Sequence, residues 1–256
     1  MEKIILNNSR NKILAGIFYH AKGEKVIVMC HGYSSDKSME GRAQTLANKL
    51  TSSGFSCFAF DFSGCGESED DSLSITKEIE DLHSAVNYVK SLGYKKIALY
   101  GHSLGALICL MAYSPEIITM VLSGALTDTI IQEVKTHYSQ EQINELMEKG
   151  QISLSVKNPL RDSLVIDKQM LADLEELNQE QVLSKVKCPV LIIHGNTGPD
   201  ELMLLTKTQN GIRFLPAGSK IKIINGAGHN FDNHIETLTK LTNDWFKKYL
   251  DYSNPP

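Results

Sequence analysis

The sequence predicts an α/β protein in which a mostly parallel central sheet is covered by helices on both faces. Two observations predict this class: solidly apolar runs recur along the chain, and stretches with helical periodicity separate them. A run that is apolar throughout is typical of a strand buried on both faces, as in a parallel sheet. These runs are 26–30, 55–60, 96–100, 117–122, 190–194 and 220–224. The expected helices are 39–53, 75–92, 104–113, 200–210 and 232–250.

The N-terminal residues predict an antiparallel hairpin. Apolar residues 4–6 and 13–18 flank a polar turn at 7–12, which is the pattern of two strands joined by a turn. The solidly apolar runs begin only after this hairpin, at Val26. We therefore expect two antiparallel strands followed by a sheet that is otherwise mostly parallel.

One long interval interrupts the alternation of strands and helices. Residues 125–187 show helical patterning but no convincing buried strand. Because this interval lies between two core strands, we expect it to be a small cap, inserted after the sixth strand, over one edge of the sheet. The expected core is then 1–124 and 188–256. The helices expected in the cap are 129–149 and 167–183, joined by a polar stretch at 150–163.

The composition argues against several classes of protein. The 26 basic and 30 acidic side chains give a formal net charge of −4, which offers no basic stripe for nucleic acid and no cationic face for an anionic membrane. No apolar run approaches the roughly 20 residues that span a bilayer, and the N-terminus is too polar after Leu6 for a signal peptide. We expect no nucleic-acid partner and no integral membrane association.

The cysteines indicate a reducing compartment. They are odd in number, scattered and mostly inside apolar runs, which is typical of buried free thiols. Neither CxxC, HExxH nor another metal-ligand spacing occurs, and the GxG at 64–66 lacks the third glycine and the following helix of a dinucleotide loop. We expect a cytoplasmic protein without a metal or an organic cofactor. The five cysteines are Cys30, Cys57, Cys65, Cys109 and Cys188.

The strongest local signal is the sequence YGHSLGA at 100–106, between a buried strand and an apolar helix. Glycines on both sides of Ser103 allow a sharp, strained turn and close packing of the helix on the sheet. Such a turn exposes the serine hydroxyl at a helix N-terminus, where developing negative charge is favoured. Ser103 is therefore the predicted nucleophile, and the alternative is an inert serine in a turn.

A serine nucleophile needs a base and a carboxylate that orients the base. His229 is the predicted base, because the glycine-rich loop NGAGHNF at 225–231 follows the last strand and can bring an imidazole inward. The predicted acid is Asp200, which follows the preceding strand, and Glu201 and Asp128 remain alternatives. Asp200 could equally serve only as a helix N-cap. The order nucleophile, acid, base along the chain is that of one hydrolase fold.

Acyl transfer also needs donors for an oxyanion. The first buried strand ends in CHGYSS at 30–35, where Gly32 lets the backbone turn its N–H groups toward the strand ends. We expect the backbone N–H groups of Tyr33 and Leu104 to be the donors, each worth about 3 kcal/mol of transition-state stabilisation. His31 is expected to hold this loop by hydrogen bonds and to do no chemistry.

Taken together, these motifs resemble the α/β-hydrolase superfamily over most of the chain outside the cap. The segments that match it are HGYSSDKS (31–38), DFSGCGES (61–68), GHSLGA (101–106), IIHGNTGPDELM (192–203) and GAGHNF (226–231). Within the superfamily they are similar to feruloyl and cinnamoyl esterases and to monoacylglycerol-lipase-like hydrolases. The resemblance implies the same nucleophile, base and oxyanion donors. The family usually reads HG-x-x-D, and Gly198 stands at the position of that aspartate, so Asp200 matches only with a two-residue insertion.

The sequence therefore predicts a serine carboxylesterase that hydrolyses small to medium acyl esters through an acyl-enzyme. Hydroxycinnamoyl esters and monoacylglycerols are the candidate substrates that the resemblance implies. The alternatives are a thioesterase or a peptidase with the same triad, and a non-catalytic protein of this fold that binds a small ligand. The expected partner is a small-molecule ester, and the expected state is a monomer or a homodimer.

Overall fold

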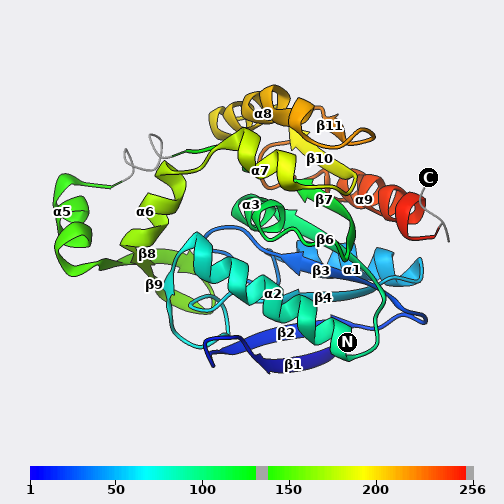
Figure 1. Ribbon diagram of the computed structural model, residues 1–256, viewed down its shortest axis with the longest axis horizontal. Helices are drawn as coiled ribbons and strands as arrows, with labels where there is room; N and C mark the ends of the chain where they lie inside the picture. The colour runs from blue at the N-terminus through cyan, green and yellow to red at the C-terminus, as the bar shows by residue number, and fades with distance from the viewer. Residues whose placement is uncertain (131–137, 252–256) are drawn as a thin grey trace.

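A computed structural model describes residues 1–130 and 138–251 of the chain. Its centre is an eight-stranded sheet in the order β1-β2-β4-β3-β6-β7-β10-β11 (Figure 1). The pairs β1–β2 and β2–β4 are antiparallel, and the five other pairs are parallel. The strands are β1 (Glu2–Asn7), β2 (Ile13–Tyr19), β3 (Lys25–Cys30), β4 (Ser56–Phe60), β6 (Lys96–His102), β7 (Ile117–Ser123), β10 (Val190–Gly195) and β11 (Lys220–Ile224). The predicted mostly parallel sheet and its antiparallel N-terminal hairpin are confirmed.

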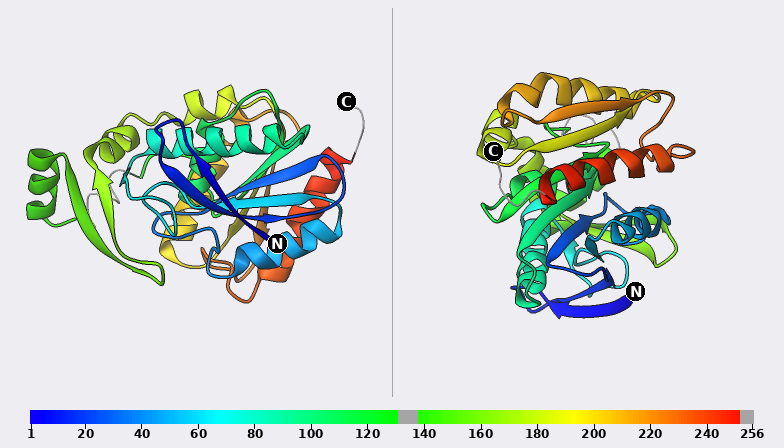
Figure 2. Two further views of the ribbon diagram at one scale, coloured as in Figure 1. Left: turned by 90° about the horizontal axis from the view of Figure 1, so that it is seen from below. Right: turned by 90° about the vertical axis from the view of Figure 1, so that its right-hand side faces the viewer.

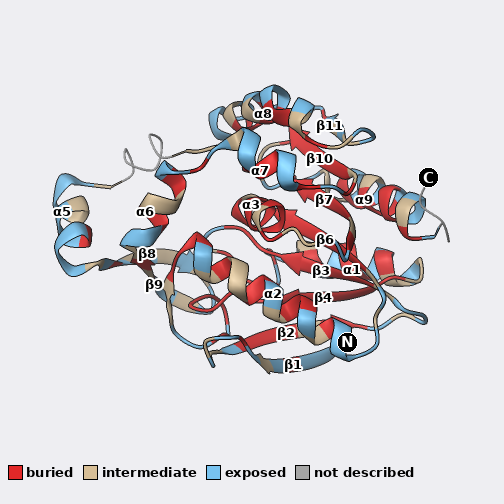
Figure 3. Cartoon of the chain, in the orientation of Figure 1, coloured by how far each residue is buried: buried red, intermediate tan, exposed pale blue. Residues whose placement is uncertain are grey.

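Helices cover both faces of this sheet, and the strand residues alternate between the two layers. In β3, Val26 and Val28 pack in one apolar cluster with α2 and α3, whereas Ile27 and Met29 pack in the other with α1 and α9. The central strands are therefore buried on both sides (Figure 3), as their solidly apolar sequences predicted. The helices of the core are α1 (Arg42–Ser52), α2 (Ile75–Ser91), α3 (Leu104–Met111), α8 (Pro199–Gly211) and α9 (Ile235–Leu250).

The segment expected as a cap lies between β7 and β10, and β7 is the sixth strand of the main sheet in chain order. Figure 2 shows α5, β8 and β9 projecting beyond one end of the main sheet, with α9 at the opposite end. The limits 125 and 187 of a separate cap stay a prediction. The elements of the segment are α5 (Gln140–Lys149), β8 (Gln151–Asn158), β9 (Arg161–Asp167), α6 (Lys168–Glu175) and α7 (Gln179–Lys185).

The β8–β9 hairpin corrects the expectation of a strandless linker at 150–163. The two strands pair with each other, and β9 also pairs with the short strand β5 (Ser72–Leu73) in a three-stranded sheet. In β8, the apolar Ile152, Leu154 and Val156 alternate with exposed polar residues. This period of two is typical of a strand with one face in water, which a search for solidly apolar runs does not detect.

The two helices expected in the segment also differ from the observed ones. The described part of the first is α5, which begins after Ser139 with a capping box to Gln142, and residues 131–137 lie outside the described residues. The second is divided into α6 and α7, because Asn178 starts a new helix with its own side-chain cap on the Gln181 N–H.

Candidate active site

Ser103 lies at a sharp turn between β6 and α3. Its backbone has φ 55° and ψ −118°, a conformation in which a side chain other than glycine is strained. The flanking glycines are needed for packing: a Cβ on Gly105 would lie 2.4 Å from the His31 carbonyl oxygen, and one on Gly101 would lie 2.6 Å from the Gly105 carbonyl oxygen. The turn therefore presents the Ser103 hydroxyl at the carboxyl ends of the parallel strands, as its sequence predicted.

His229 reaches Ser103 from the loop between β11 and α9. Its Nε2 lies 3.0 Å from the Ser103 Oγ, which is hydrogen-bond distance. The Ala227 carbonyl oxygen of this loop accepts hydrogen bonds from the Asn196 and Thr197 N–H groups, at 3.0 and 3.1 Å. The loop is thus tied to the end of β10, and the structure brings together two side chains that are 126 positions apart in sequence.

The carboxylate at His229 is Glu201, which corrects the choice of Asp200. The His229 Nδ1 lies 2.7 Å from the Glu201 Oε2, and Glu201 is only 1% exposed. Asp200 is exposed on the first turn of α8, because neighbouring residues on a helix point in different directions. Asp128, the other alternative, accepts a hydrogen bond from the Thr129 N–H at 2.8 Å and has no described hydrogen bond to His229.

The start of α8 decides which acidic residue faces inward. Gly198 has φ 84°, in the left-handed region, and Pro199 is the first residue of the helix. Glu201 is consequently its third residue and points at the end of β10, where its carboxylate accepts from the Gly195 N–H at 2.8 Å. The motif spacing could not predict this, because it does not give the conformation of Gly198.

A second histidine contacts the same carboxylate, and the sequence analysis did not identify it. His194 in β10 is fully buried, and its Nδ1 lies 2.8 Å from the Glu201 Oε1. Burial raises the pKa of Glu201, but the hydrogen bonds from His194 and His229 outweigh burial and bring the pKa below its ordinary value. Glu201 is therefore ionised at neutral pH. The available signal was a histidine inside a buried strand, since such a side chain needs a partner.

The loop after β3 packs against the turn at Ser103, as the oxyanion prediction requires. A Cβ on Gly32 would lie 3.1 Å from the Ser103 Cβ and 3.3 Å from the His102 carbonyl oxygen. Leu104 is the first residue of α3, where a helix leaves its backbone N–H groups without partners in the helix. Leu104 thus follows Ser103 in the chain, and Tyr33 follows Gly32, which packs against Ser103. Their role as oxyanion donors stays a prediction.

Hydrogen bonds and an ion pair of buried polar side chains hold the loop after β3 in place. The His31 Nδ1 donates to the Gly32 carbonyl oxygen at 2.8 Å, and its Nε2 accepts from the Phe62 N–H at 3.2 Å. Burial lowers the pKa of His31, so the ring is neutral, as this pair of hydrogen bonds requires. The Lys37 Nζ lies 2.6 Å from the buried Asp61 Oδ2, which ties the loop to the segment after β4.

A family model described as "Serine aminopeptidase, S33" matches residues 21–182, which is more than half of the chain. The chain belongs to this family. A curated Escherichia coli protein of 31.7 kDa, from the traX–finO intergenic region, is 21% identical over 88% of this chain and 91% of its own length. The family and the fold identify the protein as a hydrolase of the α/β-hydrolase fold.

Solved structures of esterases share this fold. The complex of ferulic acid with Est1E from Butyrivibrio proteoclasticus superposes with a TM-score of 0.80, at 19% identity, over 97% of this chain and 100% of that one. The α/β-hydrolase GrgF from a Penicillium species gives 0.78 at 16% identity, over 98% and 99%. The esterase PF2001 of Pyrococcus furiosus gives 0.72 at 17% identity, over 97% and 91%. At these identities the likeness shows the fold of this S33-family hydrolase.

The inserted segment contacts the loops beside the site. The Asn158 Nδ2, at the β8–β9 turn, donates to the Ser34 carbonyl oxygen at 3.3 Å and to the Asp36 Oδ2 at 3.0 Å. A hydrogen bond joins the side chains of Tyr33 and Tyr138, and burial raises the pKa of the Tyr33 hydroxyl. The segment therefore touches the loop that carries the predicted oxyanion donor.

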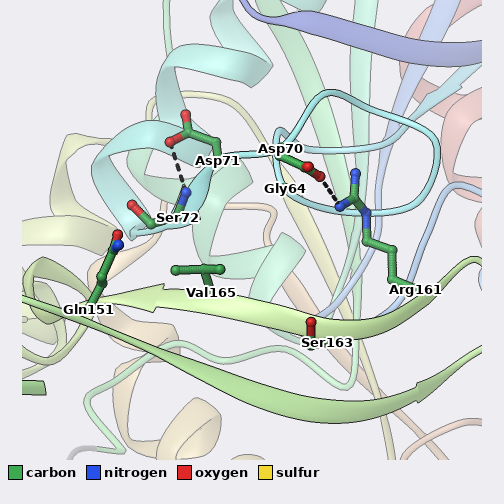
Figure 4. A pocket seen from close by; sticks show the side chains of 8 residues that line it. All are labelled: Gly64, Asp70, Asp71, Ser72, Gln151, Arg161, Ser163 and Val165. Atoms are coloured by element: carbon green, nitrogen blue, oxygen red, sulfur yellow. Dashed lines mark hydrogen bonds and ion pairs between the residues drawn. The ribbon is translucent and has the colours of Figure 1, made fainter. Parts of the chain in front are cut away.

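A hollow of about 320 Å³ lies between β9 and the loop after β4, and Figure 4 shows its lining side chains. Arg161 lines it and makes an ion pair with Asp70 and a hydrogen bond to the Gly66 carbonyl oxygen at 2.9 Å. Ser103, Glu201 and His229 are not among its lining residues, so it is separate from the candidate active site.

Two searches of the described residues bear on partners. No helix in residues 1–130 and 138–251 is long and apolar enough to cross a membrane. Within the same ranges, no group of three or more histidine, cysteine, aspartate or glutamate residues is arranged to hold a metal ion. The five cysteines are free and buried.

Proposed function

We propose that this hydrolase is a serine carboxylesterase that works through an acyl-enzyme. The proposal rests on one observation: the hydrogen-bond chain from Ser103 Oγ to His229 Nε2, and from His229 Nδ1 to Glu201 Oε2, is unbroken at 3.0 and 2.7 Å. This is the geometry of nucleophile, base and orienting acid that activates a serine. A protein that only binds a ligand would have no need of it.

In the proposed first half-reaction, Ser103 Oγ attacks the ester carbonyl carbon while its proton passes to His229 Nε2. The carbonyl oxygen becomes an oxyanion, which the N–H groups of Tyr33 and Leu104 stabilise. Glu201 stabilises the imidazolium that forms, because its carboxylate is ionised and 2.7 Å from Nδ1. Collapse of the intermediate breaks the bond to the alcohol, which leaves with the proton from His229.

In the second half-reaction, water replaces the alcohol. His229 Nε2 takes a proton from the water as the hydroxide attacks the acyl carbon, and the same N–H groups stabilise the second oxyanion. When the bond to Ser103 Oγ breaks, the proton on Nε2 returns to that oxygen. The carboxylic acid is released, and the free enzyme is restored without a cofactor.

We propose esters with an aromatic or medium-length acyl group as substrates. The structure that superposes with a TM-score of 0.80 is described as holding ferulic acid, a hydroxycinnamate. Five apolar residues of the inserted segment are candidates to line the acyl site: Met147, Leu154, Leu160, Leu164 and Met170. Leu164 and Met170 belong to the buried core, whereas Met147 and Leu160 are exposed. Leu154 is half-buried on β8 and packs against the same core.

The proposal is tested with p-nitrophenyl esters of increasing acyl length and one hydroxycinnamate ester. Wild-type protein should turn over at least one of them, and Ser103→Ala should lose turnover by at least about 10³-fold while keeping the wild-type circular dichroism spectrum. A maximum at the aromatic ester would favour a feruloyl-esterase-like enzyme, and a maximum at long chains a lipase-like one. Equal turnover by wild type and Ser103→Ala would refute the proposal.

A peptidase is the second candidate, because the description of the matching family names a serine aminopeptidase. Amide and thioester hydrolysis pass through the same kind of tetrahedral intermediate, so the triad geometry fits all three reactions. Aminoacyl p-nitroanilides and an acyl thioester, assayed beside the esters, separate these activities. A kcat/KM for an anilide above that for every ester would assign the enzyme as a peptidase.

The proposed setting is the cytoplasm, with the enzyme as a monomer or a homodimer. The five free, buried cysteines support a reducing compartment, because none of them is placed in a disulfide. The partner is then the small ester itself. Sedimentation of the purified protein distinguishes the two oligomeric states.

A further inference from the structure

The carboxylate of Glu201 lies between two imidazoles. Its Oε2 faces His229 Nδ1 at 2.7 Å, and its Oε1 faces His194 Nδ1 at 2.8 Å. His194 and Glu201 are both at most 1% exposed, so water does not replace the contact between them. The reaction proposed above uses only the first imidazole, and the second is unassigned.

The hydrogen bonds around His194 fix its tautomer. A carboxylate only accepts hydrogen bonds, so the His194 Nδ1 carries a proton and donates it to Glu201. Its Nε2 lies 2.9 Å from the Thr208 Oγ1. In the neutral ring this nitrogen has a lone pair, and therefore the Thr208 hydroxyl donates its one proton to His194.

The chain of donors continues away from the site. The Thr127 Oγ1 lies 3.2 Å from the Thr208 Oγ1, and the Gln179 Nε2 donates to Thr127 at 3.4 Å. Since the Thr208 proton is already used, the Thr127 hydroxyl donates to Thr208. Gln179 in α7 thus donates to Thr127, Thr127 to Thr208, Thr208 to His194, and His194 to Glu201 in α8. All four hydrogen bonds run in the same direction, toward the carboxylate.

We propose that His194 is a positioning residue, which keeps Glu201 ionised and holds its Oε2 toward His229. Thr208 in turn holds His194 in the tautomer that can donate. The proposal rests on the function proposed above, in which Glu201 orients the base. A glutamate side chain has one more rotatable bond than aspartate, so a carboxylate at its end needs a second anchor. His194 and the Gly195 N–H supply that anchor at Oε1.

The other ionisable groups at the cluster do not substitute for this contact. The His102 ring lies 5.0 Å from that of His229, and its Nδ1 contacts the Ser123 Oγ at 3.0 Å. Burial keeps the pKa of His102 well below its ordinary value, so this ring is neutral. Arg42 points to the Asn230 carbonyl oxygen at 2.7 Å. His194 is therefore the imidazole that contacts Oε1, the Glu201 oxygen that does not face His229.

The test compares His194→Leu with His194→Asn. Leucine fills the site without a donor, whereas the asparagine amide can place an N–H where Nδ1 was. His194→Leu should lower kcat about 10- to 100-fold with KM within about twofold, since a hydrogen bond to a buried charge is lost. The acid limb of its kcat/KM profile should move to higher pH, because the less stabilised carboxylate attracts the proton on the His229 imidazolium more strongly. His194→Asn should recover most of kcat and the wild-type limb.

A second measurement needs no turnover and no variant of His194. In wild-type protein labelled with ¹⁵N-histidine, two-bond ¹H–¹⁵N spectra at pH 8 should show His194 protonated on Nδ1 only. Thr208→Val should disturb this ring signal and lower kcat in the same direction as His194→Leu. Circular dichroism and the melting temperature report whether each variant is folded.

The outcomes separate the two proposals. If wild-type protein hydrolyses no ester but His194 carries its proton on Nδ1, the esterase proposal fails and the contact with Glu201 stands. A proton on His194 Nε2 alone would overturn the inference, whatever the activity. So would a His194→Leu variant with wild-type kcat and pH profile, or Leu and Asn variants that lose kcat equally with the acid limb unmoved.

Discussion

At the scale of single residues, the direction of two adjacent carboxylates decides the composition of the candidate site. Glu201 is 1% exposed and bonded to His229, whereas its neighbour Asp200 is exposed. The sequence identified Ser103 and His229 as candidates because glycines and strand ends mark their turns. It favoured Asp200 over Glu201 and Asp128 as the acid, because the rotation of α8 depends on the conformation of Gly198, which the sequence does not give.

The first prediction compares the two carboxylates by isosteric amides. Glu201→Gln should lower kcat/KM for a p-nitrophenyl ester by about 10³- to 10⁴-fold, because the amide cannot stabilise the imidazolium. Asp200→Asn should stay within about twofold of wild type, because that side chain is exposed and has no described contact with His229. Steady-state kinetics at one pH check both variants. Loss of activity in Asp200→Asn, with Glu201→Gln unaffected, would instead assign Asp200 as the acid, as the sequence predicted.

At the scale of elements, the β8–β9 hairpin connects the inserted segment to the candidate site. Its Asn158 donates to the carbonyl oxygen of Ser34, the residue after Tyr33, and to the side chain of the buried Asp36. The sequence analysis did not predict this hairpin, because β8 alternates apolar and polar residues and is only half-buried. The core strands were predictable for the opposite reason, since burial on both faces requires apolar residues throughout.

The second prediction concerns this contact. Asn158→Ala should lower kcat about 3- to 10-fold, because the loss of its hydrogen bonds to the Ser34 carbonyl oxygen and to the Asp36 carboxylate loosens the loop that holds the Tyr33 N–H. The matched control is Asn144→Ala, an exposed asparagine of the same segment that contacts only Gln140 among the described hydrogen bonds. The control should keep wild-type kcat. Identical kcat for both variants would show that the hairpin does not support the loop.

At the scale of the whole molecule, a buried carboxyl group makes the stability of the fold depend on pH. Burial, together with a smaller contribution from the nearby Asp81, raises the pKa of Glu78 in α2 to about 8. Its Oε2 has no hydrogen-bond partner among the described residues. Between the ordinary pKa of glutamate and pH 8, the folded protein keeps a proton that the unfolded chain has lost. Stability should therefore fall as pH rises through this window.

The third prediction is that Glu78→Gln stabilises the protein at alkaline pH. The amide has no charge to bury, so at pH 8 the free energy of unfolding should exceed that of wild type by on the order of 3–5 kcal/mol. The difference should nearly vanish at about pH 3.5, where wild-type Glu78 is mostly protonated in both states. Urea denaturation at the two pH values measures it. An equal difference at both pH values would show that the effect is not the titration of Glu78.

The whole-molecule architecture was the part that the sequence predicted best. Alternation of buried strands and amphipathic helices is sufficient to specify a mostly parallel sheet with two helical layers, and the structure and the family agree with it. The contacts of the inserted segment were not predictable. They depend on single polar residues such as Asn158 and Arg161, whose partners lie far away in sequence.

Covalent labelling by a fluorophosphonate tests the central claim, an activated Ser103, most directly. Because only an activated serine reacts rapidly with this probe, wild-type protein should gain one adduct, and peptide mass spectrometry should map it to Ser103. His229→Ala should label much more slowly, and Ser103→Ala should not label. Folded wild-type protein that gains no adduct, or gains it on another residue, would contradict the account.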